Sequence, residues 1–116
     1  MKVVYISRTG NIQKLIDRIS PADTLKIESG EESVKENYIL ITYTDGAGII
    51  PPAVEKFLDL NNQNCKGVAV SGNKERHPDT YCFAADKIEE KYSLPILIKF
   101  DKDGDSSVDA IIKAAL

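Results

Sequence analysis

The stretch Val3-Val4-Tyr5-Ile6-Ser7-Arg8-Thr9-Gly10-Asn11-Ile12 begins as a short apolar run and ends in hydroxyl side chains, a glycine and an asparagine. Apolar residues then recur at helical spacing as far as Ile19, where Ser20-Pro21 ends the pattern. The stretch therefore predicts a strand, a loop and a helix. Free backbone N–H groups and the positive end of the helix dipole meet at such a helix start, and both favour an anion. We expect Ser7–Asn11 to hold a phosphate-sized group.

Working outward from this unit, four more strands and three more helices are expected. Buried strands are predicted by apolar, β-branched runs, and a half-exposed one by alternation at Thr24–Ile27. The buried strands are expected at Tyr38–Tyr43 and Gly67–Val70, and a last strand at Pro95–Phe100. Helices are expected at Val54–Leu60, from a cap at Asp79 or Thr80 to Tyr92, and over Val108–Leu116. Ser29–Glu36 is polar and acidic and is expected to be a solvated loop.

This alternation of strands and helices predicts an α/β fold with a parallel sheet covered by helices on both faces. We expect five strands in the order 2-1-3-4-5. In that arrangement a ligand crevice lies beyond the C-terminal ends of strands 1 and 3, where the strand order reverses.

Composition restricts the functional classes. The chain has 116 residues and a formal net charge of −3, and a single domain spanning residues 1–116 is expected. It has no polybasic run to bind nucleic acid and no apolar stretch long enough to cross a membrane. It also has no signal-peptide pattern, and Cys65 and Cys82 lie far apart without a CxxC motif. A cytoplasmic protein with reduced thiols is therefore expected.

Three segments of unusual chemistry follow predicted central strands: Ser7–Asn11, Thr44–Pro51 and Ser71–Pro78. Because the C-terminal ends of parallel strands share one edge of the sheet, we expect these loops to converge on one ligand. Gly46 and Gly48 would let backbone approach a flat ring closely. Tyr43 and Tyr81 are candidates for stacking on that ring, although either could instead pack in the core.

Some other interpretations of these loops are excluded by the sequence, and others remain open. The Walker A pattern and the GxGxxG dinucleotide fingerprint are absent, and no cysteine stands in the first loop to act as a nucleophile. Thr9 or Asn11 could simply cap the first helix. The single histidine, His77, could be an ordinary surface residue.

At these residues the chain resembles a known family. Ser7–Asn11 resembles the FMN phosphate loop of flavodoxins. Thr42–Gly48 with Pro51, together with Gly67–Lys74, resembles the NrdI family more closely, and the similarity extends to Ala85-Asp86 and Leu94-Pro95-Ile96. NrdI proteins are small flavodoxin-like proteins that assist class Ib ribonucleotide reductase.

The resemblance implies a flavodoxin-like three-layer sandwich that binds FMN without a covalent bond. It also implies that the reduced flavin, supplied with electrons by a flavin reductant, reacts with oxygen. The resulting oxidant, superoxide in the accepted scheme, would reach the dimanganese site of the radical-generating reductase subunit. The metal and the tyrosyl radical belong to that partner, so no catalytic or metal-ligating residues are expected in this chain.

Carried over by position, the resemblance assigns residues to three parts of the FMN site. The phosphate would be cradled by Ser7, Arg8, Thr9, Gly10, Asn11 and Ile12. The ring would be bordered by Tyr43, Thr44, Asp45 and Gly46, with the Gly46 peptide free to flip near flavin N5. The other ring edge would be lined by Ser71, Gly72 and Asn73. Arg76, His77 and Tyr81 are expected at the cofactor as well, but the family pattern does not assign them.

One segment departs from the family pattern. After Ser-Gly-Asn-Lys the family commonly has an aromatic residue and a glycine, whereas this chain reads Glu75-Arg76-His77-Pro78. Pro78 can neither adopt a glycine's positive φ nor donate an N–H. Arg76 is a candidate to stabilise an anionic reduced flavin. A generic flavodoxin-like electron carrier and a binding module without flavin remain the alternatives.

Overall fold

The computed structural model describes all 116 residues and contains a single five-stranded sheet. All neighbouring strands pair in parallel, in the order β2-β1-β3-β4-β5. The strands are β1 (Lys2–Tyr5), β2 (Thr24–Lys26), β3 (Tyr38–Tyr43), β4 (Cys65–Gly72) and β5 (Ile96–Asp101). The predicted fold class and strand order are confirmed.

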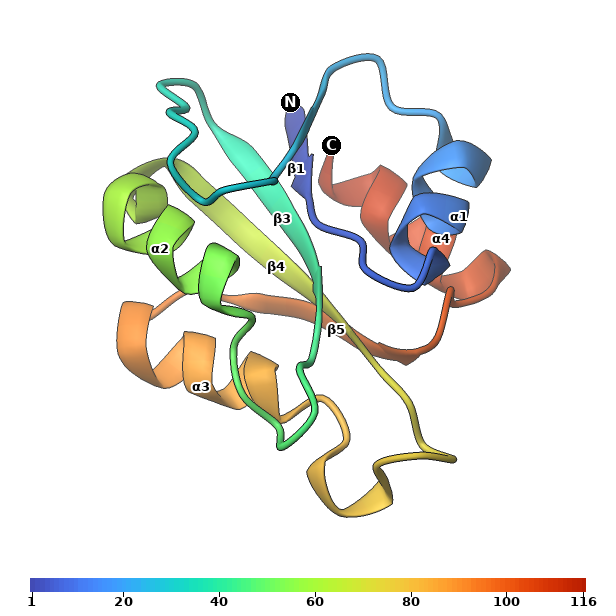
Figure 1. Ribbon diagram of the computed structural model, residues 1–116. Coiled ribbons are helices and arrows are strands. Elements are labelled where there is room, and N and C mark those ends of the chain that lie inside the picture. The colour runs from blue at the N-terminus through green and yellow to red at the C-terminus, as the bar shows by residue number, and fades with distance from the viewer.

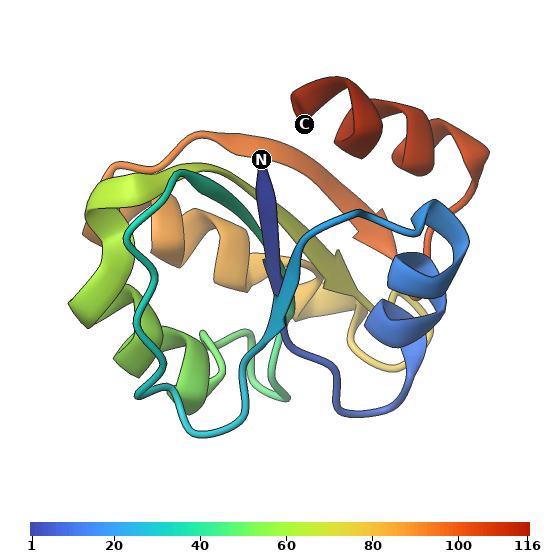
Figure 2. The ribbon, with the colours of Figure 1, turned by 90° about the horizontal axis from the view of Figure 1, so that it is seen from above.

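Four α-helices cover the sheet on both faces. They are α1 (Asn11–Ile19), α2 (Pro52–Asn61), α3 (Phe83–Tyr92) and α4 (Ser106–Ala115), with short 3₁₀ turns at Asn62–Asn64 and Pro78–Thr80. Figures 1 and 2 show α2 and α3 on one face and α1 with α4 on the other. The connections after β1, β3 and β4 leave the sheet at the same end (Figure 1).

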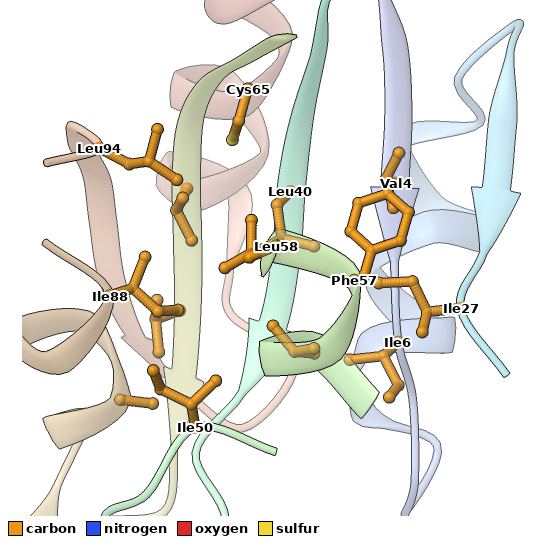
Figure 3. Close-up of a cluster of buried hydrophobic side chains, with 14 of the residues drawn as sticks. Val4, Ile6, Ile27, Leu40, Ile50, Phe57, Leu58, Cys65, Ile88 and Leu94 are labelled. Atoms are coloured by element: carbon orange, nitrogen blue, oxygen red, sulfur yellow. The ribbon is translucent and has the colours of Figure 1, made fainter. Parts of the chain in front are cut away.

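Alternation along the strands builds two cores, because successive side chains of a strand point to opposite faces. Val4 and Leu40 belong to the cluster under α2 and α3, whereas Val3 and Ile39 belong to the cluster under α1 and α4. Figure 3 shows Phe57 of α2 among Val4, Ile6 and Ile27 of the first cluster. Since both faces are buried, the central strands consist almost entirely of apolar residues.

The Ser29–Glu36 segment is more ordered than a solvated loop, so that expectation is partly wrong. The Glu32 carboxylate accepts the backbone N–H groups of Glu28, Ser29 and Gly30 at 2.9–3.1 Å. Val34 is buried in the core. The segment is therefore folded onto α2, and the carboxylate of Glu32, within the segment, organises its backbone.

Two helix predictions also need correction. Asp79 and Thr80 do not cap α3, because they lie in the Pro78–Thr80 turn and the N-cap is Cys82, with φ 55°. The buried Cys82 side chain fixes this point of the chain under the sheet, so the helix begins only after it. The helix expected over Val108–Leu116 is α4, which begins two residues earlier, at Ser106, and ends at Ala115. The expected strand Gly67–Val70 extends over Cys65–Gly72.

No helix combines the length and apolar character needed to traverse a lipid bilayer.

Candidate functional site

A pocket lies at the C-terminal ends of β1, β3 and β4, where the three predicted loops meet. All the predicted site residues line it except Ser7 and Gly10, and two unpredicted residues, Thr80 and Cys82, line it as well. The lining residues are Arg8, Thr9, Asn11, Ile12, Tyr43, Thr44, Asp45, Gly46, Ser71, Gly72, Asn73, Arg76, His77, Thr80, Tyr81 and Cys82. The expected convergence of the loops is therefore found in the structure.

The first loop presents a row of free donors. The N–H groups of Thr9, Gly10, Asn11 and Ile12 donate to no protein acceptor, and the first turn of α1 has no acidic residue. Gly10 serves as the N-cap with φ 95°, a left-handed conformation that glycine adopts at little cost. Consecutive free N–H groups at a helix start form an anion-binding site.

The side chains of Thr9 and Asn11 do not cap α1, so the simple capping interpretation is wrong. Ser7 contributes instead, because its Oγ accepts the N–H of Gln13 at 3.3 Å. Ser7 therefore shapes the loop from behind without lining the pocket. This leaves the Thr9 hydroxyl and the Asn11 amide free at the pocket wall.

The second loop is a tight turn organised by Asp45. The Asp45 carbonyl accepts the N–H groups of Gly48 at 2.8 Å and Ile49 at 3.3 Å, and its Oδ1 accepts the N–H of Gly46 at 2.8 Å. The peptide between Asp45 and Gly46 is thus held at both ends. The next peptide, from Gly46 to Ala47, makes no hydrogen bond within the protein, so it is the one that is free to flip.

Arg8 joins the first loop to the second. Its Nη1 donates to Asp45 Oδ1 at 2.7 Å, and its Cζ lies 4.8 Å from the centroid of the Tyr43 ring. The Arg8 guanidinium holds the pKa of the Asp45 carboxyl below its ordinary value. Burial raises the pKa of Tyr43, so this phenol stays neutral at the pocket wall.

Ser71 and Thr44 tie β3 to β4 at the pocket floor. The Ser71 carbonyl accepts both the N–H of Thr44 at 2.9 Å and the Thr44 hydroxyl at 3.0 Å. The Ser71 hydroxyl donates to the Lys102 carbonyl. Both hydroxyls are therefore used inside the protein, which indicates a positioning role.

The third loop is held by Asn73 and packed around Gly72. Asn73 Oδ1 accepts the N–H groups of Glu75 and Arg76, each at 3.1 Å. A Cβ atom at Gly72 would lie 2.8 Å from Tyr81 Cδ1 and 2.9 Å from the Cys82 nitrogen. Only glycine allows this close approach, which places Tyr81 against the pocket.

Arg76 and His77, at the departure from the family pattern, line the pocket with side chains that have no hydrogen-bond or ion-pair partner. Pro78 follows them and opens the Pro78–Thr80 turn. Arg76 thus supplies an uncompensated positive charge beside the pocket.

The two residues missed by sequence reasoning lie just beyond the third loop. Thr80 packs against the second loop, because a Cβ at Gly48 would lie 3.0 Å from Thr80 Cβ. Cys82 is fully buried, and burial raises the pKa of its thiol. Neither carries a local sequence signal, since their positions depend on where α3 begins. No cluster of three or more metal-ligating side chains exists in the structure.

A parallel 2-1-3-4-5 sheet, a row of free N–H groups at the helix start after β1 and two further loops around the same pocket are the features of a flavodoxin-like protein. A family model described as NrdI flavodoxin-like matches residues 3–113. The chain therefore belongs to the NrdI flavodoxin-like family.

Solved structures show the same fold at low sequence identity. One is a flavodoxin from Streptococcus pneumoniae TIGR4, with 21% identity, a TM-score of 0.63, and coverage of 97% of this chain and 92% of that one. Another is a short-chain flavodoxin associated with a bacterial microcompartment, with 18% identity, a TM-score of 0.60, and coverage of 99% and 97%.

Membership of the family implies FMN as the cofactor. The residues present fit this group. Four free N–H groups suit its phosphate, and Tyr43 and Tyr81 stand at the walls where a flat ring would enter.

Proposed function

We propose that this protein is a redox flavoprotein that helps to assemble the dimanganese–tyrosyl radical cofactor of a class Ib ribonucleotide reductase small subunit. When bound and reduced, FMN would react with oxygen and supply the oxidant. The observation that carries this proposal is the family match over residues 3–113. A cytoplasmic location suits the proposal, because both cysteines are free thiols.

The proposed roles of the residues follow from the pocket. The free N–H groups of Thr9 to Ile12, with the Thr9 hydroxyl and Arg8, would bind the phosphate. FMN phosphate carries roughly −1.5 to −2 charges if it behaves like other phosphate monoesters, so donors and a guanidinium suit it. Asp45 and Gly46 would border one ring edge, and Gly72 and Asn73 the other.

Charge beside the pocket supports a site for a reduced, anionic flavin. Arg76 has no acidic partner there, and Lys74 Nζ lies 4.9 Å from the centroid of the Tyr81 ring. A nearby cation stabilises negative charge on a bound ring and thereby favours the reduced state. These residues would tune the flavin, while the oxygen chemistry belongs to the cofactor.

The second candidate is a general electron carrier, and it is favoured by the solved flavodoxins of the same fold. The two functions differ in what the reduced protein does with oxygen and with its partner. An electron carrier would pass electrons to many acceptors. It would not be required for a radical to form in the reductase subunit.

The test uses FMN-loaded protein reduced without oxygen by dithionite. It is mixed with a class Ib small subunit loaded with Mn(II) and then exposed to air. We expect a tyrosyl radical signal by electron paramagnetic resonance that requires this protein. Yellow protein that gives no radical would favour the electron carrier. Protein that remains colourless after dialysis against excess FMN would leave only a binding module without flavin.

A further inference from the structure

Arg8 belongs to the loop proposed to bind phosphate, yet in the structure it is turned toward the ring side of the pocket. It donates to Asp45 Oδ1 at 2.7 Å and lies 4.8 Å over the Tyr43 ring. Its side chain is 54% exposed, so no packing prevents it from moving. The Arg8 guanidinium thus covers the face of the Tyr43 ring on which the flavin is expected to stack.

The pocket is narrow in this arrangement. Its cavity volume is about 90 Å³. Pockets that enclose drug-sized ligands are typically ~300–1,000 Å³. A flat ring therefore requires a side chain at the wall to move, and Arg8 is the one that covers the Tyr43 face.

We propose that Arg8 makes the site selective for phosphorylated flavin by covering Tyr43 until an anion occupies the first loop. The inference rests on the proposed FMN site and deepens it. An anion at Thr9–Ile12 draws the guanidinium away from Asp45, because phosphate offers more charge and more acceptor oxygens than one half-buried carboxylate. The Tyr43 face is then open to the ring.

The consequence is a coupling between the two halves of the ligand. Riboflavin, which lacks the phosphate, must displace Arg8 from Tyr43 and Asp45 with nothing to receive the guanidinium. FMN provides that acceptor itself. By reciprocity, any anion that draws Arg8 to the first loop should tighten riboflavin binding, and riboflavin should tighten anion binding equally.

The test measures riboflavin affinity by fluorescence quenching with and without inorganic phosphate, with potassium chloride at matched ionic strength as the reference. We expect phosphate to tighten riboflavin binding about 5- to 10-fold, in the lower part of the usual range for coupled sites. In Arg8→Gln the effect should disappear. Lys14→Gln is the matched control, because it removes an exposed positive charge of α1 that contacts neither Asp45 nor Tyr43.

Equal tightening in Arg8→Gln, or none in the unaltered protein, would overturn the inference. FMN titration of the same samples separates the two proposals. Strong FMN binding without a phosphate effect contradicts only the role of Arg8, whereas absence of FMN binding contradicts the proposed function as well.

Nuclear magnetic resonance of the flavin-free protein adds a readout independent of flavin. Phosphate should shift the Tyr43 ring and Gly46 amide signals in the unaltered protein and leave them unchanged in Arg8→Gln.

Discussion

At the scale of single residues, Thr9 offers a direct test of the phosphate loop. Its hydroxyl lines the pocket and makes no hydrogen bond inside the protein, so its removal costs the fold little. A hydrogen bond to a charged group contributes roughly 1.5–3 kcal/mol. We therefore expect Thr9→Ala to weaken FMN binding about 10- to 100-fold, at about 1.4 kcal/mol per factor of ten. Titration of flavin-free protein with FMN measures this, and an unchanged affinity would remove Thr9 from the site.

Gly72 tests whether the third loop needs its close contact with the strand end. A Cβ there would lie 2.8 Å from Tyr81 and 2.9 Å from the Cys82 backbone. Backbone cannot yield easily, so Gly72→Ala should push the third loop outward and lower FMN affinity several-fold. The matched control is Gly67→Ala on the same strand, where the nearest atoms to the added Cβ belong to a side chain and not to backbone, Leu97 Cγ and Cδ2 at 2.8 Å. We expect Gly67→Ala to retain FMN affinity, and equal losses in both variants would contradict this interpretation.

The sequence predicted which loops form the pocket, because a strand end followed by glycine and hydroxyl residues is a local pattern. It did not predict the contact of Arg8 with Asp45 and Tyr43. That contact joins residues 37 positions apart in the chain and depends on how two loops lie in space. Thr80 and Cys82 were missed for the same reason.

At the scale of elements, Asn61 holds the Glu28–Val34 segment to the end of α2. Its Oδ1 accepts the Val34 N–H at 2.9 Å, and its Nδ2 donates to the Glu32 carbonyl at 2.8 Å. The side chain is buried, although Asn61 opens a run of four polar residues, Asn61-Asn62-Gln63-Asn64. Its hydrogen bonds link a loop to a helix, and such a link has no signature in the local pattern.

Asn61→Leu should therefore destabilise the protein. The substitution leaves the buried Val34 N–H without an acceptor, which costs roughly 1–3 kcal/mol, and also loses the two hydrogen bonds that Nδ2 donates to the Glu32 and Phe57 carbonyls. The expected decrease in the free energy of unfolding is about 2–4 kcal/mol, measured by urea denaturation. The control is Gln63→Leu, two residues along, where the side chain is exposed and makes no hydrogen bond. A comparable loss in the control would show that the hydrogen bonds are not the cause.

The start of α3 shows why element boundaries were harder to predict than elements. Asp79 and Thr80 are good capping residues, and the apolar pattern after them is helical. The structure places a 3₁₀ turn there, with α3 starting at Phe83. Burial of Cys82 and the contact with Gly72 determine that start. Tertiary packing overrode a local capping preference.

At the scale of the whole molecule, the strand order could be predicted because continuous apolar runs require burial on both faces. That requirement leaves few topologies for five parallel strands joined by helices. The contact between α1 and α4 could not be predicted. Arg18 of α1 donates to both carboxylate oxygens of Asp109 at 2.7 and 2.8 Å and to the Asp103 carboxylate at 3.0 Å. These partners lie more than 80 positions away along the chain.

Contacts with guanidinium or backbone N–H groups lower the pKa of several carboxyl groups in the folded protein. The Arg18 guanidinium holds the pKa of Asp109 below its ordinary value, and Arg8 does the same for Asp45. For Glu32, burial acts to raise the pKa, but the backbone N–H groups around it outweigh burial and the pKa is lowered. A carboxyl whose pKa is lower in the folded state stabilises folding when it is ionised.

Stability should therefore fall on the acid side. The contribution of these carboxyls is fully present above their unfolded pKa of about 4 and is lost as the pH falls through their lower folded values. We expect the free energy of unfolding, measured with urea at intervals from pH 7 to pH 3, to change little down to about pH 5 and then to decrease. Arg18→Gln should make that decrease shallower, because the pKa of Asp109 then returns toward its unfolded value and fewer protons are taken up on unfolding. Lys14→Gln removes a charge of the same helix without touching an acid and should keep the original slope. If Arg18→Gln and Lys14→Gln give the same pH dependence, the ion pair between α1 and α4 is not what links stability to protonation.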